Sequence, residues 1–361
     1  MSSAVALSPA ASAAVPKATP FRIPSLDGMR AASLLLVLTT HASGTRGFVN
    51  WGPLRMLAHL GVHAFFTISG FLITTLLCRE LEKTRTISLQ KFYLRRFRRI
   101  APPAMVLLVT IAALTAAGVL DVPWKHFLAA ATYTSNFKGD LHWNVAHTWS
   151  LSCEEQFYLL WPPVLKYFGR QTGARVCVGA IVLAPLLRVL VYRTGHLDQW
   201  GLSFPLHVDA LAFGCLLALE GHRLLASERW RRFLCSHTFY LVPAAAVAGW
   251  ALYRYPDLYS VIGQPLMFLS ITLCIQRWTN FPDGRAGWLL NLRPVAWFGM
   301  MTYSLYLWQQ LFLDRRSDRW YNTFPLSAAL MFIPALLSYY YVELPFVQGK
   351  VLRLPDERRT P

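Results

Sequence analysis

The chain consists of long apolar runs separated by short polar and basic stretches. These runs recur from about residue 29 to residue 346, and no region between them has the composition of a soluble domain. They are continuous and about 17 to 22 residues long rather than alternating, which predicts helices that cross a bilayer. Because only helices and closed barrels can span lipid, the pattern indicates an all-α, polytopic membrane protein.

The runs divide into about ten predicted spans, which we expect to form a helical bundle around a polar cavity. A shorter segment, Trp124 to Tyr133, is too brief to cross and is expected to lie at the interface or to re-enter the membrane. The membrane domain, 24–346, is expected to lie between a disordered cytoplasmic tail, 1–23, and a cytoplasmic C-terminal tail, 347–361. The predicted spans lie near residues 28–43, 59–78, 103–120, 153–169, 174–192, 206–220, 239–254, 258–276, 295–313 and 325–345.

Positive charge is distributed unevenly between the segments that connect the spans. Charged residues make up 15% of the chain, against roughly 25% in soluble domains, and the formal net charge is +17. Assigned alternately to two sides, the connecting segments and tails give 24 Lys and Arg residues on one side and nine on the other. The positive-inside rule therefore places both termini in the cytoplasm. The same rule explains the net charge, so we expect no nucleic-acid partner.

The cysteines give no indication of a metal site. The chain has six, and none shows a C-x-x-C or other metal-binding spacing. Most lie in or beside predicted spans, where they are expected to act as small apolar residues. We therefore expect no bound metal.

Two ionisable residues, Arg30 and His41, lie within the first apolar run. Eleven positions make almost three turns at about 3.6 residues per turn, so the side chains share a helix face, about 16 Å apart along the axis. Ionisable groups within lipid are costly and usually face a protein interior or a watered cavity. The spacing therefore predicts a functional site on this face of the helix.

Several passages, in this order, resemble the acyltransferase 3 family, the integral membrane O-acyltransferases of bacterial polysaccharide modification. They are the Arg30/His41 segment, Gly61-Val-His-Ala-Phe-Phe-Thr-Ile-Ser-Gly-Phe-Leu-Ile-Thr74, Phe92-Tyr-Leu-Arg-Arg-Phe-Arg-Arg-Ile-Ala-Pro-Pro103 and His147-Thr-Trp-Ser-Leu-Ser-Cys-Glu-Glu-Gln-Phe-Tyr-Leu-Leu-Trp-Pro162, with weaker matches at 299–308 and 341–345. The third passage looks like the family's basic cytoplasmic loop. The resemblance covers residues 24 to about 346.

The chain departs from the family pattern at three positions. His63 stands where the family commonly has Asp, Cys153 where a small aliphatic residue is usual, and Gln309 where a His is frequent. These departures bear on the choice of acceptor more than on the class of reaction.

The resemblance implies transfer of an acyl group, acetyl or another short one, from cytoplasmic acyl-CoA to a hydroxyl. The implied acceptor is a cell-envelope or exported glycan or glycolipid, and the implied location is the bacterial cytoplasmic (inner) membrane. Such a transfer needs a base for the hydroxyl proton, and imidazole titrates near neutral pH. We expect His41 to be that base or to form an acyl-imidazole; the two alternatives stay open.

The expected role of Arg30 is to stabilise the thioester oxygen or to hold an anionic part of the donor. The structural alternative is an anchor that extends to the cytoplasmic headgroups. Glu154 and Glu155 are expected to begin a span, about 100° apart on the helix. One of them, with Glu154 preferred, would orient His41 as a carboxylate does in a catalytic triad. Favourable interaction with the helix dipole is the alternative for both.

The densest cluster of positive charge is formed by Arg95, Arg96, Arg98 and Arg99, with aromatic residues among them. Arginine binds phosphate bidentately, so these side chains could hold the phosphates of acyl-CoA. On one helix face the cooperating set would be Arg95, Arg98 and Arg99, or Arg96 and Arg99. A topogenic signal or binding of anionic lipid heads is the alternative.

Further polar residues in or near the spans are candidates for lining a substrate cavity: His63, Ser69, His147 and Asp209. For each of them a purely structural role is at least as well supported. Gly61, Ser69 and Gly70 are also small enough to permit close helix packing.

The main alternative class is an ion-coupled transporter, because buried Arg, His and Glu residues also form proton relays. Transporters often consist of two similar halves, and the sequence shows no such repeat. A third class, a lipid- or partner-binding membrane protein without enzyme activity, would not require Arg30 and His41 to share a helix face.

Overall fold

The structure, a computed structural model, describes residues 23–349. Nearly all of the two predicted tails lies outside the described residues. Every regular element within them is helical, which confirms the all-α class for this part of the chain. The α-helices are α1 (Leu26–Ala42), α2 (Leu57–Thr84), α3 (Leu89–Ala116), α4 (Trp124–Ala131), α5 (Trp143–Ala146), α6 (Thr148–Pro163), α7 (Gly169–Arg193), α8 (Leu197–Trp200), α9 (Val208–Leu225), α10 (Glu228–Cys235), α11 (Leu241–Ala251), α12 (Pro256–Leu258), α13 (Gln264–Asn280), α14 (Gly284–Asn291), α15 (Arg293–Met300), α16 (Thr302–Phe312), α17 (Leu326–Leu337) and α18 (Leu344–Val347).

Each predicted span overlaps one or two of these helices. By length and hydropathy, five helical stretches could cross a membrane, or six if α9 and α10, bent by 112°, form one span. The chain is therefore a helical membrane protein, and the number ten stays a prediction. The five stretches are Gly52–Thr84, Leu89–Ala116, Trp143–Arg193, Pro256–Asn280 and Leu326–Val347.

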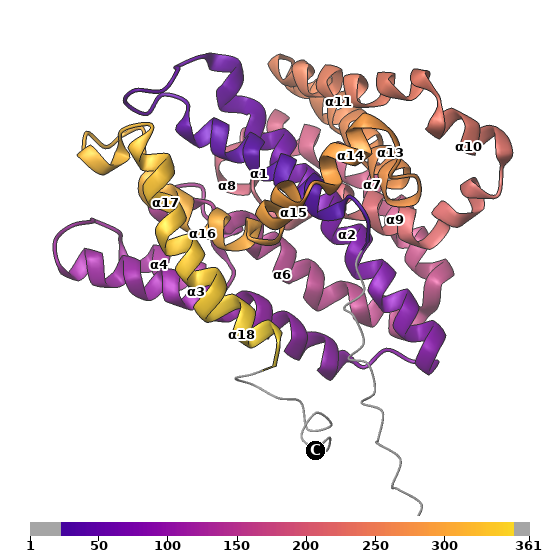
Figure 1. Ribbon diagram of the computed structural model, residues 1–361, viewed down its shortest axis with the longest axis horizontal. Helices are drawn as coiled ribbons and strands as arrows, with labels where there is room; N and C mark the ends of the chain where they lie inside the picture. The colour runs from indigo at the N-terminus through magenta and orange to yellow at the C-terminus, as the bar shows by residue number, and fades with distance from the viewer. Residues whose placement is uncertain (1–22, 350–361) are drawn as a thin grey trace, which may run out of the picture.

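Helix α1 lies within the bundle, where it contacts α2, α14, α15 and α16 (Figure 1). Glycines permit the closest approaches. A Cβ atom on Gly61 would lie 2.5 Å from the carbonyl oxygen of Ser33, so only glycine lets α2 pack this tightly on α1. A Cβ atom on Gly70 would collide with the carbonyl of Leu211 in α9. The predicted role of Gly61 and Gly70 in close packing is confirmed.

Helix α3 begins earlier than the sequence suggested. The basic segment expected as a loop is the first half of a single helix that continues through Pro102 and Pro103. The side chain of Ser88 caps its N-terminus by accepting a hydrogen bond from the backbone N–H of Lys91, at 3.4 Å. The arginines of this segment are therefore held at fixed helical positions.

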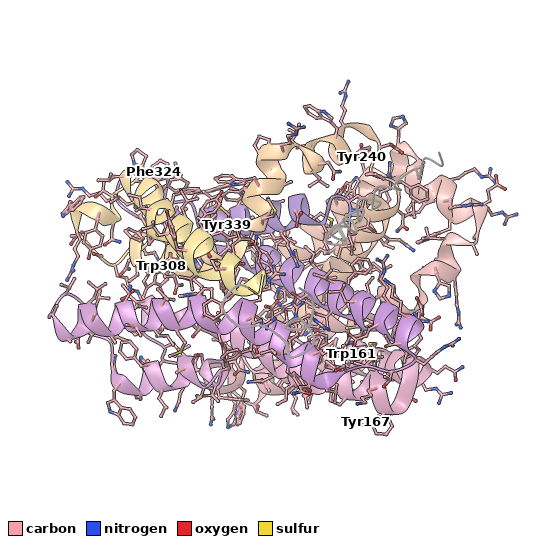
Figure 2. The ribbon with its side chains drawn as sticks, turned by 60° about the horizontal axis from the view of Figure 1, so that its bottom comes forward. Trp161, Tyr167, Tyr240, Trp308, Phe324 and Tyr339 are labelled. Atoms are coloured by element: carbon pink, nitrogen blue, oxygen red, sulfur yellow. The ribbon has the colours of Figure 1, made fainter. Side chains whose placement is uncertain are left out.

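The outer faces of several helices carry exposed apolar side chains, as expected for surfaces in contact with lipid. Tyr167 points away from the bundle, whereas Trp161 lies inside and donates a hydrogen bond from Nε1 to Oγ1 of Thr74 at 2.8 Å (Figure 2). Exposed apolar residues of α3, α6 and α7 include Met105, Val109, Leu159, Leu160, Val178, Val182, Leu183, Leu186 and Leu190.

Candidate active site

Two cavities lie next to each other in the bundle, and Val62 and Tyr306 line both of them. The first, here called the arginine cavity, has a volume of about 90 Å³. The second, the histidine cavity, has a volume of about 530 Å³. The arginine cavity is lined by Arg30, Arg96 and Arg99 together with Ser69 and Glu154. The histidine cavity is lined by His41, His59, His63, His147 and His207.

Three helices bring the three guanidinium groups and one carboxylate of the arginine cavity together. Arg30 comes from α1, Arg96 and Arg99 from α3, and Glu154 from α6. Oγ of Ser69 donates a hydrogen bond to Oε1 of Glu154 at 2.6 Å. With three cations and one anion in its lining, this cavity suits an anionic ligand such as phosphate.

The four arginines of α3 do not act as one cluster. Arg96 and Arg99 line the arginine cavity, and the guanidinium of Arg96 lies over the ring of Tyr158, 5.7 Å from its centroid. Arg95 instead pairs with Glu80 at 3.0 Å on the exposed side of the helix. Arg98 is buried and does not line this cavity. Of the two sets predicted from helical spacing, the structure brings together Arg96 and Arg99.

His41 lies at the C-terminal end of α1 and faces the histidine cavity. Its Nδ1 is 2.9 Å from Oε1 of Gln309 in α16, and its ring packs edge-on against Trp143 with centroids 5.3 Å apart. Because an amide oxygen only accepts, Nδ1 carries the proton and Nε2 keeps its lone pair. The geometry therefore holds His41 in the tautomer that can accept a proton at Nε2.

His147 is held in the same way by the next residue of α16. Its Nδ1 is 2.7 Å from Oε1 of Gln310, and its backbone N–H donates to the same oxygen at 3.0 Å. The carbonyl of His147 accepts a hydrogen bond from the hydroxyl of Tyr306 at 2.9 Å. Two neighbouring amides thus fix two histidines of one cavity.

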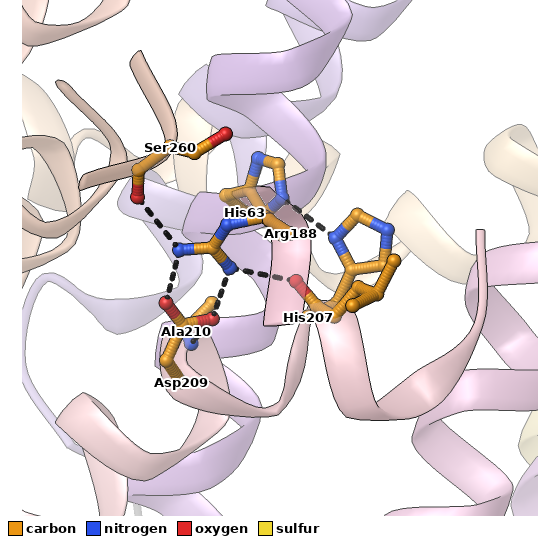
Figure 3. Close-up of polar contacts among 7 residues, drawn as sticks. His63, Arg188, His207, Asp209, Ala210 and Ser260 are labelled. Carbon is orange, nitrogen blue, oxygen red and sulfur yellow. Dashed lines mark hydrogen bonds and ion pairs between the residues drawn. The ribbon is translucent and has the colours of Figure 1, made fainter. Parts of the chain in front are cut away.

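His63 and His207 form a direct pair in the wall of the histidine cavity (Figure 3). Nε2 of His63 is 3.1 Å from Nδ1 of His207. The other ring nitrogen of His63 is 2.6 Å from the carbonyl oxygen of His59, and that of His207 is 3.0 Å from the carbonyl oxygen of Gly201. Within residues 23–349, no group of three or more His, Cys, Asp or Glu side chains is placed to hold a metal ion.

The family assignment follows from comparison with known proteins. The model of the acyltransferase 3 family, described as an acyltransferase domain, matches residues 23–344. The chain belongs to the acyltransferase 3 family. The matched range contains every residue that lines the arginine and histidine cavities, so both cavities lie within the acyltransferase domain. No solved structure matches this chain significantly.

Proteins similar to this chain include named O-acetyltransferases. The peptidoglycan O-acetyltransferase OatA of Listeria monocytogenes is 26% identical over 366 residues, covering 90% of this chain and 55% of the relative. The O-acetyltransferase OatA of Staphylococcus aureus is 25% identical over 325 residues, covering 80% of this chain and 50% of the relative. The chain thus spans about half the length of these relatives.

The expectation that a glutamate of this acyltransferase 3 domain orients His41 does not match the structure. Gln309 contacts His41, while Glu154 accepts from Ser69 in the arginine cavity. Glu155 faces a third cavity, of about 650 Å³, and its buried Oε1 has no hydrogen-bond partner. Helix α6 begins at Thr148 and not near residue 153, so both glutamates lie about 10 Å along the helix from its start.

Asp209, another candidate for the lining of a substrate cavity, lines neither the arginine cavity nor the histidine cavity. Its carboxylate is fully buried and accepts two hydrogen bonds from Arg188, at 3.0 and 2.7 Å (Figure 3). The same guanidinium donates to the carbonyls of Leu206 and Ser260 at 2.7 and 3.2 Å. Asp209 therefore neutralises a buried cation that joins three segments. Among the other candidates, Ser69 lines the arginine cavity, and His63 and His147 line the histidine cavity.

Sequence reasoning missed the contacts made by α16. Gln309 stood out only as a departure from the family pattern, and Gln310 and Tyr306 were not identified. The available signal was a pair of adjacent amides in an apolar run, since buried polar side chains need hydrogen-bond partners. Their partners lie 268 and 163 residues away in the chain.

Proposed function

We propose that this chain is a membrane O-acetyltransferase that moves an acetyl group from acetyl-CoA to a hydroxyl of a cell-envelope glycan or glycolipid. The observation that carries the proposal is the contact between the two cavities. One offers arginines for an anionic donor, the other offers His41 as a base, and Val62 and Tyr306 line both. The relatives' names support a glycan as acceptor.

The donor enters the arginine cavity in this proposal. Arg96 and Arg99 hold the phosphates of CoA, and the pantetheine arm passes Arg30 towards the wall shared by the two cavities. The lysines and arginines of the connecting segments support a cytoplasmic position for this cavity, with both termini on the same side of the bacterial inner membrane. Arg30, which lines the same cavity, stabilises negative charge on the thioester oxygen in this proposal.

The acceptor enters the histidine cavity. His41 Nε2 takes the hydroxyl proton while the acceptor oxygen forms a bond to the acyl carbonyl carbon. The tetrahedral intermediate collapses with cleavage of the carbon–sulfur bond, and the protonated His41 gives its proton to the thiolate sulfur, which leaves as CoA-SH. Gln309 holds His41 through Nδ1, the position that the buried Asp occupies in a Ser-His-Asp triad. An amide orients the ring without adding charge.

The test uses purified protein in nanodiscs with radiolabelled acetyl-CoA and a peptidoglycan or glycolipid fraction. We expect acceptor-dependent release of CoA, and its loss in His41→Ala by at least about 100-fold, the lower range for general-base catalysis. His196→Ala, at an exposed histidine outside both cavities, is the matched control and should retain full activity. Label retained on the protein would indicate an acyl-histidine intermediate.

Two results would count against the proposal. Equal turnover by wild type and His41→Ala would remove His41 from the chemistry. Absence of acetyl-CoA binding and turnover with every acceptor fraction would exclude the acyl-CoA reaction and make the transporter class the leading alternative.

A further inference from the structure

The arginine and histidine cavities share only two lining residues among those described, Val62 and Tyr306. Val62 belongs to α2 and Tyr306 to α16, so the shared wall is formed by side chains from opposite halves of the chain. Both are more than nine-tenths buried. Anything that reacts between the two cavities must therefore be in contact with these two side chains.

Tyr306 is fixed in place by polar contacts. Its hydroxyl donates to the carbonyl of His147 at 2.9 Å and lies 2.7 Å from Oγ of Ser150. Its ring also packs edge-on against the ring of His147, with centroids 5.4 Å apart. A movement of the phenol would break contacts in a buried setting, where lost hydrogen bonds are not replaced by water. The Tyr306 side chain is therefore held in a fixed position in the wall between the two cavities.

Val62 is fixed through its neighbours. Gly61 packs α2 directly on the backbone of α1, and His63 is held by His59 and His207. A valine in a helix also has one strongly preferred rotamer, because its Cβ is branched. The isopropyl group therefore has a preferred position between the two cavities.

We infer that Val62, opposed by Tyr306, sets the length of the acyl group and limits the donor to short-chain acyl-CoA, with acetyl as the fitting case. This inference rests on the proposed function. The thioester sulfur comes from the arginine cavity and the acceptor oxygen from the histidine cavity, so the carbonyl carbon lies at the shared wall. The acyl chain beyond that carbon then packs against Val62.

The test compares acetyl-CoA, propionyl-CoA and butyryl-CoA as donors with one acceptor, in wild type, Val62→Ala, Val62→Leu and Leu151→Ala. Leu151 lines the arginine cavity but not the shared wall, so it controls for enlargement elsewhere. In Val62→Ala we expect the ratio of kcat/KM for butyryl-CoA to that for acetyl-CoA to rise at least tenfold. In Leu151→Ala the ratio should stay within twofold of wild type. In Val62→Leu acetyl transfer should fall at least tenfold.

Thermal unfolding in the same nanodiscs shows whether a variant is folded, because this measurement does not depend on the donor cavity that Val62 and Leu151 line. A Val62→Ala protein that is folded by this measure but keeps the wild-type donor ratio overturns the inference and leaves the proposed function intact. An equal rise in Leu151→Ala also overturns it. If wild type transfers no acyl group from any of the three donors, the proposed function fails first, and the inference fails with it.

Discussion

Nε2 of His63 lies 3.1 Å from Nδ1 of His207, while the opposite nitrogen of each ring faces a backbone carbonyl. A carbonyl accepts only, so each opposite nitrogen must carry a proton. Two neutral rings would then present lone pairs to each other. The two rings can form a hydrogen bond only in two cases. Either a further proton lies between Nε2 of His63 and Nδ1 of His207, or one ring loses its hydrogen bond to the backbone carbonyl and donates to the other ring instead.

The pair should behave as one energetic unit. We expect His63→Ala and His207→Ala each to destabilise the protein and the double variant to cost less than their sum, with a coupling of about 1 kcal/mol. The free energy of unfolding in mild detergent measures this cycle. Strict additivity would show that the two rings do not interact.

Gln309 should act as a positioning residue for His41. Gln309→Leu removes the acceptor for Nδ1, so the ring is free to rotate, and we expect kcat to fall about 100-fold with unchanged CoA affinity. Gln309→Glu keeps an acceptor at the same reach and should recover most of the activity. Steady-state kinetics and CoA binding together make the test. A loss of CoA affinity in Gln309→Leu, or no recovery in Gln309→Glu, would contradict the assignment.

Arg96 and Arg95 provide a matched pair of variants for the donor site. Arg96→Ala removes a guanidinium from the arginine cavity, and we expect the Kd for CoA to rise about tenfold to a hundredfold, as for loss of a charged hydrogen bond. Arg95→Ala breaks only an exposed pair with Glu80 and should stay within about twofold. Calorimetry with CoA in nanodiscs without anionic lipid measures both. Equal losses of CoA affinity in Arg96→Ala and Arg95→Ala would indicate general attraction of CoA to the positive surface and not a defined binding site.

The ion pair of Arg188 and Asp209 should matter for stability. Asp209→Ala leaves a buried guanidinium without its carboxylate, which typically costs about 3 to 5 kcal/mol. Removing both charges, in Arg188→Met with Asp209→Leu, should restore much of the loss. Thermal unfolding in detergent distinguishes these outcomes. Arg193→Ala, which breaks an exposed pair with Asp257, is the control and should leave the unfolding temperature almost unchanged.

Local pattern was sufficient for part of this architecture. The apolar runs identified the helical membrane class, and the 3.6-residue period placed Arg30 and His41 on one helix that contributes to both cavities. Helical spacing also gave Arg96 and Arg99 as one of two cooperating sets. These features depend on residues close in the chain.

The features that sequence could not supply depend on where helices begin and on distant contacts. Helix α6 begins at Thr148, and its Glu154 contacts Ser69, a residue 85 positions away in the chain. The contact between His41 and Gln309 joins residues 268 positions apart. The two residues that line both cavities, Val62 and Tyr306, are likewise brought together only by the packing of the bundle.

Gln309 and Gln310 occupy consecutive positions on α16, about 100° apart around its axis, and each holds a different histidine. A rotation or slide of α16 would therefore displace His41 and His147 together, whereas substitution of one glutamine would release only one of them. Helix α16 therefore positions both imidazoles, and their placement relative to each other depends on the geometry of two consecutive residues of that helix.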